Sequence, residues 1–433
     1  MAQDPTGVTI FSYQVGFGDC FLLRFHYDGG DRHLLIDFGT TGIPEHEEND
    51  LMVRVAADIE TKCGGMLAGV VATHRHADHI SGFATKADKS GSGDIIARID
   101  IGTVVQPWTE APDAEKDSLG PEISSDVRSL AKRQASLQAM HDTAARVVEM
   151  LDTKALKHAP KEIKERLGFI GRDNVKNLSA VENLMRIGGS HVYAYHGSDA
   201  GLETALPGVT TRVLGPPTLR QTETIRKQRS RDPDEYWHFA LKGLNADKKF
   251  SEAGEEIRLF PDHPAHPGGK LPMEVRWIAK RLTEGRSQQF LGLVSALDKQ
   301  MNNTSLILLF EVGGKKLLFP GDAQIENWRF ALSKPEIVAL LADVDVYKVG
   351  HHGSLNATPR SMWAKFAKKG GKDSGDRLTT LLSTMPGKHG HAEDHTEVPR
   401  QSLLNDLKAL SDLHSTHEME PGKLYQEVTI AFA

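Results

Sequence analysis

The chain has 433 residues, of which 39% are hydrophobic, and this is enough for a sizeable packed core in one large domain or two smaller ones. Its formal net charge of -6 excludes a global basic field of the kind that binds nucleic acid loosely, so an anionic partner would have to be held locally. Cys20 and Cys63 form no CxxC pair, and neither a signal-like start nor a long apolar segment occurs, so we predict a reduced cytoplasmic protein with no membrane anchor and no disulfide-linked partner.

Short apolar runs in the first part of the chain predict a β-sheet. Residues 8–15, 20–27 and 33–39 are rich in β-branched and aromatic residues and are separated by the glycine-rich turns GFGD and DGGDR. Residues 51–63 have the periodicity of an amphipathic helix, and residues 67–74 have the pattern of a buried strand that runs directly into a cluster of histidines. The cluster is therefore expected at the C-terminal end of a strand, where α/β enzymes place ligands.

Two segments in the middle of the chain interrupt this pattern. Residues 101–190 are highly charged and predict a helical insertion, whereas residues 217–295 are polar and predict a loop-rich insertion. Between them, residues 191–197 and 209–217 have the pattern of strands. We therefore predict a single domain over residues 1–433 that carries both insertions.

The last third of the chain returns to alternating strands and helices. A Gly-Gly turn joins two apolar strands over residues 304–323, and further strands are predicted at 344–350, 379–385 and 425–432. This alternation predicts an α/β fold. The helices are predicted at residues 326–333, 335–341 and 398–411.

The sequence THRHADHISG, residues 73–82, concentrates side chains that bind metal ions. His74 and His76 are two residues apart, so on an extended segment they point to the same side and can hold one ion. Asp78 and His79 follow where the chain is expected to turn into a helix, and they face a second ion position. An isolated histidine is more often a polar residue without a metal, but this concentration of ligands favours a metal centre.

Other strand ends offer further ligands. A centre with two cations needs an anionic bridging ligand, and Asp322 in FPGDA is the candidate, with a helix N-cap as the alternative. His351 and His352 end the next strand, and one of them is expected to be a ligand, with His352 favoured because it precedes a glycine. His196 ends another strand and is the candidate for the remaining ligand, although packing of that strand would explain it equally well.

Together these residues resemble the metallo-β-lactamase fold superfamily. Within it, the chain is most similar to the hydrolase domain of the competence protein ComEC and its free-standing relatives. The chain differs from that group in its two insertions, in having no membrane channel portion, and in TMPGKHGH, which replaces the Asn-containing sequence that usually precedes the late motif. The matching segments are VGFGDCFLL, LLIDFG, THRHADHISGF, NNTSLILLFEVGGKKLLFPGDA, DVYKVGHHGS and KHGHAEDH.

The resemblance implies an αββα sandwich with metal ions held at strand ends along one edge. It implies that Asp322 bridges two ions and that Asp37 is a buried carboxylate that orients a ligand histidine. The metal would be Zn²⁺ or Mn²⁺, because histidines with two carboxylates suit either. One ion would be held by His74, His76 and His196, and the other by Asp78, His79 and either His352 or His351.

These features predict a metal-dependent hydrolase. Two cations close together lower the pKa of a shared water toward neutrality, so a metal-bound hydroxide is available as the nucleophile. Asp78 is expected to orient that hydroxide, and His391 or His389 to protonate the leaving oxygen. Asn303 and Ser305 are expected to line the substrate side.

A phosphodiester or nucleic-acid substrate is favoured, which makes the protein a phosphodiesterase or nuclease. A dinuclear site neutralises a phosphoryl group well, and residues 220–232 contain Arg220, Arg226, Lys227, Arg229 and Arg231. A solvated loop is the alternative interpretation of that basic segment. Two other functions stay open: hydrolysis of a lactone, lactam or thioester, and a non-catalytic regulatory or binding role.

Overall fold

The computed structural model describes residues 4–111, 178–218, 220–222, 302–388 and 397–432. The chain divides into two compact units, and every described residue belongs to the first, which comprises Met1–Leu137, Lys176–Thr222 and Lys299–Ala433. The second unit comprises Gln138–Val175 and Glu223–Asp298 and lies outside the described residues. Most of the two predicted insertions therefore lies outside them as well.

The first sheet has seven strands in the order β13-β1-β2-β3-β4-β5-β6. Its first pairs are antiparallel, and β3, β4, β5 and β6 are parallel to one another. The C-terminal ends of these parallel strands therefore lie along one edge. The strands are β1 (Gly7–Tyr13), β2 (Cys20–His26), β3 (Arg32–Phe38), β4 (Met66–Val71), β5 (Asp100–Pro107), β6 (Ser190–Ala194) and β13 (Tyr425–Ala431).

Strand β5 lies at the start of the predicted helical insertion. Its sequence DIGTVVQP places Val104 and Val105 fully inside the protein, on opposite faces of the sheet. A β-branched pair of this kind packs well in a strand that is covered on both sides. The first described residues of that predicted segment thus belong to the sheet.

The second sheet has six strands in the order β12-β11-β10-β9-β8-β7. Strands β9 to β12 are parallel, whereas β7 and β8 run antiparallel to their neighbours. The predicted Gly-Gly turn is confirmed: Gly313 and Gly314 join β8 to β9 with φ of 53° and 75°, a conformation that favours glycine. The strands are β7 (Thr210–Gly215), β8 (Ile307–Val312), β9 (Lys315–Phe319), β10 (Val346–Lys348), β11 (Thr379–Leu382) and β12 (Asp412–Ser415).

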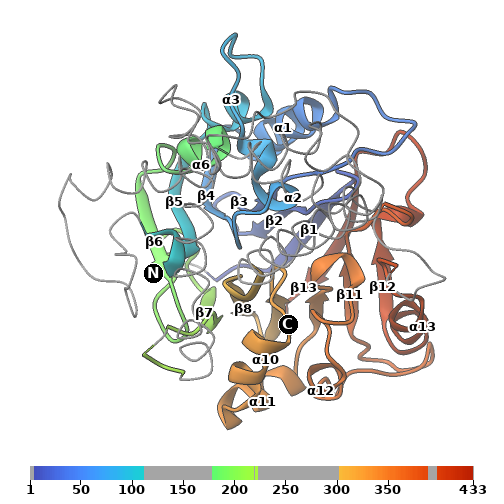
Figure 1. Ribbon diagram of the computed structural model, residues 1–433. Helices are drawn as coiled ribbons and strands as arrows, with labels where there is room; N and C mark the ends of the chain where they lie inside the picture. The colour runs from blue at the N-terminus through green and yellow to red at the C-terminus, as the bar shows by residue number, and fades with distance from the viewer. Residues whose placement is uncertain (1–3, 112–177, 219, 223–301, 389–396, 433) are drawn as a thin grey trace, which may run out of the picture. The chain divides into compact units, whose positions relative to one another are not determined.

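The two sheets pack face to face, and helices cover their other faces (Figure 1). Side chains of both sheets share one apolar core, in which the rings of Phe21 and Phe319 meet edge to face at 5.8 Å. A second core joins the first sheet to α1 (Leu51–Lys62), α3 (Ser92–Ile96) and α6 (Leu178–Leu184). A third joins the second sheet to α10 (Ile325–Leu332), α11 (Pro335–Ala342), α12 (Arg360–Trp363) and α13 (Gln401–Leu410).

Strand ends from both sheets meet at one place. The Leu306 N–H, just before β8, donates to the Thr73 carbonyl, just after β4, at 2.9 Å. The Ser383 hydroxyl, just after β11, donates to the Gly18 carbonyl in the turn between β1 and β2. These bonds bring the histidine cluster of the first sheet next to the strand ends of the second.

The structure also describes both cysteines and the helices that could be compared with a membrane span. Cys20 and Cys63 are both buried and unpaired, so neither is available for a disulfide as folded. Within the part of the chain that the structure describes, no helix combines the length and apolar character needed to cross a bilayer.

Candidate metal centre

The segment after β4 places two histidines and an aspartate close together. His76 is extended, with φ -65° and ψ 152°, and it caps the short helix α2 (Ala77–Ile80) that carries Asp78. The His74 Nε2 and His76 Nδ1 atoms lie 3.0 Å apart. With an Asp78 oxygen they form a group of buried ligand atoms that all lie within 4.8 Å of one another. Such a group has the composition of a transition-metal site.

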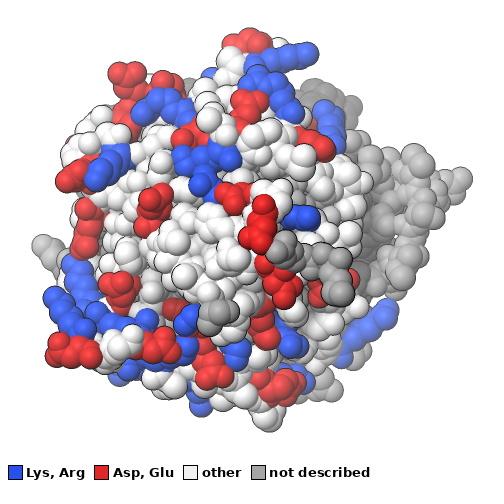
Figure 2. All heavy atoms as spheres, turned by 180° about the vertical axis from the view of Figure 1, so that it is seen from behind, with Lys and Arg blue, Asp and Glu red and all other residues white. Residues whose placement is uncertain are grey.

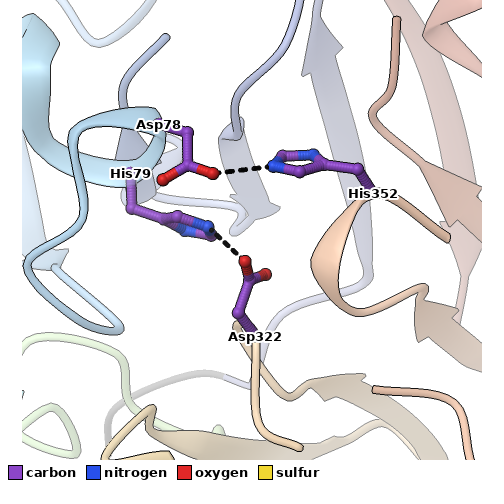
Figure 3. A group of neighbouring side chains, drawn as sticks. All are labelled: Asp78, His79, Asp322 and His352. Carbon is purple, nitrogen blue, oxygen red and sulfur yellow. Dashed lines mark hydrogen bonds and ion pairs between the residues drawn. The ribbon is translucent and has the colours of Figure 1, made fainter. Parts of the chain in front are cut away.

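A second group joins α2 to the strand ends of the other sheet (Figure 3). His79 Nε2 lies 3.1 Å from Asp322 Oδ2, and His352 Nε2 lies 2.9 Å from Asp78 Oδ2. All four side chains are buried. Because Asp78 belongs to both groups, the two groups adjoin, and each could hold a metal ion.

The backbone at these strand ends is unusual. Asp37, His351 and His352 have φ of 55°, 46° and 52°, and among the described residues the only other non-glycine residue in this region is Lys89. Each such residue costs on the order of 1–3 kcal/mol and persists where the surroundings hold it in place. At these two places the side chains of Asp37 and His352 are buried, which is consistent with a functional site.

Two of the histidines are oriented by acceptors behind them. The His79 Nδ1–H donates to Asp37 Oδ2 at 2.7 Å, and both Asp37 oxygens also accept from Thr73, through its N–H and its hydroxyl, at 2.7 Å. The His352 Nδ1–H donates to the Ser383 carbonyl at 3.0 Å. Each ring therefore turns its Nε2 atom toward the group, which is the orientation that metal-binding histidines have.

Negative charge dominates the interior of the site. Asp19, Asp37, Asp78 and Asp322 are buried, and Lys348 is the one buried lysine among the described residues. Burial alone would lower the pKa of His79, but Asp322, Asp37 and Asp78 outweigh it and hold that pKa well above its usual value. The pKa of His352 is also raised, because its bond to Asp78 and the charges of Asp19 and Asp322 outweigh burial.

The buried atoms of the site fit a divalent cation. Asp78 Oδ1, Asp322 Oδ2 and His79 Nε2 are buried, and none of them has a hydrogen-bond partner among the described residues. Buried carboxylate oxygens without donors are costly. Burial and the neighbouring His79 and His76 hold the pKa of His74 well below its usual value, so its ring is neutral, as a metal ligand must be. A cation would satisfy all of these atoms at once.

Two other predicted ligands, His351 and His196, are not members of the two groups. His351 Nε2 is 3.9 Å from Asp322 Oδ2, and its ring is partly exposed, so the geometry favours His352 as the ligand. The His196 Nδ1 atom lies 3.1 Å from the Leu214 carbonyl oxygen, and its ring packs against Phe330 at 5.0 Å. His196 is outside both groups, and its role as a ligand stays a prediction.

The predicted substrate-side and proton-donor residues are placed only in part. Ser305 is fully buried beside Gly321, just ahead of Asp322, whereas the Asn303 amide turns away and donates to Glu326 at 3.1 Å. His389 and His391 lie outside the described residues.

Two buried charged residues had no predicted role. Asp19 in GFGD and Lys348 in VDVYKVG form an ion pair beside the site. The signal for Lys348 was a charged residue inside an otherwise apolar strand, because a lysine there requires a partner. The signal for Asp19 was weaker, because an aspartate after glycines is common in turns.

We expect the metal-free protein to lose stability as the pH rises above neutrality. The raised pKa values of His79 and His352 stabilise the folded chain fully below the unfolded value of about 6.5, and this contribution disappears as the pH rises through the raised values. A bound cation replaces those protons, so metal-loaded protein should lose less. Thermal melts from about pH 6 to about pH 9, with and without chelator, measure how the melting temperature of each form depends on pH. A metal-free protein that becomes more stable over that range relative to the loaded protein would contradict the prediction.

No family model matches the sequence, and a search of curated proteins found no match.

Proposed function

We propose that the chain is a metal-dependent hydrolase of the metallo-β-lactamase fold, with a phosphodiester as its substrate. The observation that carries the proposal is the pair of adjoining ligand groups that share Asp78 and contain buried atoms without hydrogen bonds. The two sheets with their outer helices would be the αββα sandwich of that superfamily. The proposal also draws on the resemblance of the sequence to ComEC-type hydrolase domains.

The residues of the site would have distinct roles. His74, His76 and Asp78 would hold one cation, and Asp78, His79, Asp322 and His352 the other. Two divalent cations in these positions would make a water acidic enough to act as a nucleophile near neutral pH and would neutralise a phosphoryl group. Asp78 would also orient the attacking water, and Asp37 holds the ring of His79 in place.

On one face of the described residues, the charges form no basic path that would suit the backbone of a long nucleic acid (Figure 2). Figure 2 shows acidic and basic side chains interspersed on the face opposite to that of Figure 1. A groove that tracks a nucleic-acid backbone would need basic side chains gathered along one path. Of the predicted basic segment, only Arg220 is among the described residues. The cations of the centre would themselves attract an anionic substrate.

The first test is the metal content of protein purified without added metal, measured by mass spectrometry. We expect close to two ions per chain, and fewer in His76→Ala, because His76 belongs to the first ligand group. His414→Ala is the matched control, since that imidazole is on the surface and pairs only with Asp412 among the described residues. An absence of bound metal after reconstitution with zinc or manganese would refute the hydrolase proposal.

The second test is a substrate panel of bis-p-nitrophenyl phosphate, nitrocefin and a lactone. Turnover of the phosphodiester, with little turnover of the others, supports the proposed function. Preference for nitrocefin or the lactone would instead assign the same centre to ring-opening hydrolysis. Metal binding without turnover of any substrate would favour a regulatory or binding protein.

A further inference from the structure

Lys348 is the only lysine or arginine among the described residues that is buried, and it lies beside the proposed metal ligands. It is the last residue of β10 and is 2% exposed. Its ammonium group contacts the Asp19 carboxylate, donates to the Gly321 carbonyl at 3.3 Å and lies 3.5 Å from Asp322 Oδ1. An ammonium group has three protons to donate. The contact with Asp322 is an ion pair, so the ammonium group lies between two carboxylates and a backbone carbonyl.

Lys348 stays charged in this environment. Burial alone would lower its pKa, but the carboxylates of Asp19 and Asp322 outweigh burial and raise that pKa above its usual value. A permanently charged lysine inside a protein needs strong compensation. The lysine is therefore tied to two carboxylates from different sheets of the fold.

Asp19 holds Lys348 from the first sheet. It lies in the turn between β1 and β2, where its N–H donates to the Asp78 carbonyl at 2.8 Å and its carbonyl accepts from the Gly39 N–H at 3.0 Å. Its two carboxylate oxygens lie 3.7 Å from His79 Nδ1 and from His352 Nδ1. Asp19 is thus fixed by its backbone behind both histidines, and the ammonium group of Lys348 is fixed with it.

The two oxygens of Asp322 have different surroundings. Oδ1 accepts from the His351 N–H at 2.9 Å and lies next to the Lys348 ammonium group. Oδ2 lies 3.1 Å from His79 Nε2 and has no hydrogen bond among the described residues. Oδ1 is therefore held by the backbone and by Lys348, whereas Oδ2 faces the ring of His79, a member of the same ligand group. A rotation of the carboxylate would cost both contacts of Oδ1.

A simpler explanation is that Lys348 only neutralises Asp19. Buried ion pairs of that kind contribute little to stability, and replacing both partners by uncharged groups is often neutral. That explanation also does not account for the contacts of the ammonium group with Gly321 and Asp322. The two explanations differ in what happens when both charges are removed together.

We propose that Lys348, anchored by Asp19, is a positioning residue that orients the Asp322 carboxylate so that Oδ2 faces the cation. The inference rests on the proposed metal centre and deepens it. It assigns to the GFGD turn and to the lysine of β10 a joint role in metal affinity. Neither residue touches the cation in this proposal.

The test compares Lys348→Met with the double variant Asp19→Asn/Lys348→Met. The single variant leaves Asp19 buried without its cation, so a lower melting temperature is expected. The double variant removes one positive and one negative charge, so the net charge of the site is unchanged and the fold should be largely restored. Because Asp322 is no longer held, we expect the double variant to bind Mn²⁺ or Zn²⁺ about 10–100-fold more weakly by calorimetry. The visible spectrum of its Co²⁺ form should also change.

Lys368→Met is the matched control. Lys368 also forms close ion pairs, 2.6 Å from Asp345 and 3.0 Å from Asp376, and Asp345 lies just ahead of β10, whereas Lys348 ends that strand. Its loss should leave metal affinity unchanged. Asp19→Asn/Lys348→Gln is the second variant, because two carboxamides can hydrogen-bond to each other if the first double variant folds poorly.

The outcomes separate the inference from the proposed function. Wild-type affinity and a wild-type Co²⁺ spectrum in a folded double variant would show that Lys348 only neutralises Asp19 and would overturn the inference. Failure of both double variants to fold would assign the pair to folding and overturn it as well. If the wild-type protein itself bound no cation, the proposed function would be refuted, and the inference that rests on it would be refuted with it. Weak binding in the double variant supports the inference whichever ester the wild-type protein hydrolyses.

Discussion

Replacing Asp322 with asparagine is expected to lower the kcat/KM for bis-p-nitrophenyl phosphate by more than about 100-fold, because residues that only support a metal ligand already contribute 10–100-fold. The asparagine keeps the shape of the side chain and can still accept from the His351 N–H. It removes the negative charge that faces His79 through Oδ2. An uncharged amide is also a weaker ligand for a divalent cation than a carboxylate. Metal content should therefore fall together with turnover.

The control for this variant is Asp343→Asn. Asp343 is another carboxylate of the second half of the chain, but its side chain is 67% exposed, and it pairs with Lys316 at 3.1 Å. Exposed pairs of this kind contribute about 0–1 kcal/mol. The control should retain wild-type metal content and turnover. An Asp322→Asn protein with unchanged turnover would remove Asp322 from the centre and leave it as a structural residue at the start of the α10 segment.

The parts of the site that could be predicted from the sequence are those that follow from local pattern. The spacing of His74, His76, Asp78 and His79 depends only on the strand that precedes them and the helix that begins there, and the structure brings all of these side chains into the two ligand groups. Asp322 could be placed because parallel strands end at one edge of a sheet. Both inferences use neighbours in the sequence and a general rule of sheet topology.

The contacts between distant segments could not be predicted in this way. Asp19 and Lys348 meet only because the turn between β1 and β2 and the end of β10 come from sheets that pack face to face. No periodicity relates residues so far apart in the chain. The lysine could have been flagged as a buried charge, but its partner could have been any acidic residue near a strand end.

The sequence also could not show which of two adjacent residues with the same side-chain chemistry faces the interior. Asn302 and Asn303 precede β8 together, yet the Asn303 amide donates to Glu326, whereas the fully buried Asn302 amide has no hydrogen bond within the described ranges. The local backbone decides which of the two faces the interior. The choice between His351 and His352 has the same origin, since both have a positive φ and only one ring is buried. His196 differs, because a histidine after a strand serves packing and metal binding equally well.

Gly39 provides a test of the site that changes no ligand. A Cβ atom at this position would lie 2.5 Å from the Ala77 carbonyl oxygen, the Asp78 carbonyl carbon and the His79 nitrogen. These are backbone atoms of α2, so no flexible side chain can move aside. The φ of Gly39 is not in the left-handed region, and the restriction is therefore one of space. Close approach of the strand end to α2 is what places Asp78 and His79 in the site.

We therefore expect Gly39→Ala to weaken metal binding and to destabilise the protein by about 3 kcal/mol or more, the upper end for overpacking. A shift of about 1 Å in α2 would also lower turnover by about 100-fold.

Gly29→Ala is the matched control, because a Cβ atom there meets nothing within 4 Å. Calorimetric titration with Mn²⁺ or Zn²⁺ and thermal melts of both variants provide the measurement. Wild-type metal affinity in Gly39→Ala would mean that α2 can move without disturbing Asp78 and His79, and the ligand groups would then not depend on the packing of β3 against α2. Loss of affinity together with an unchanged Gly29→Ala protein would instead locate the origin of the centre in the backbone contact between these two elements.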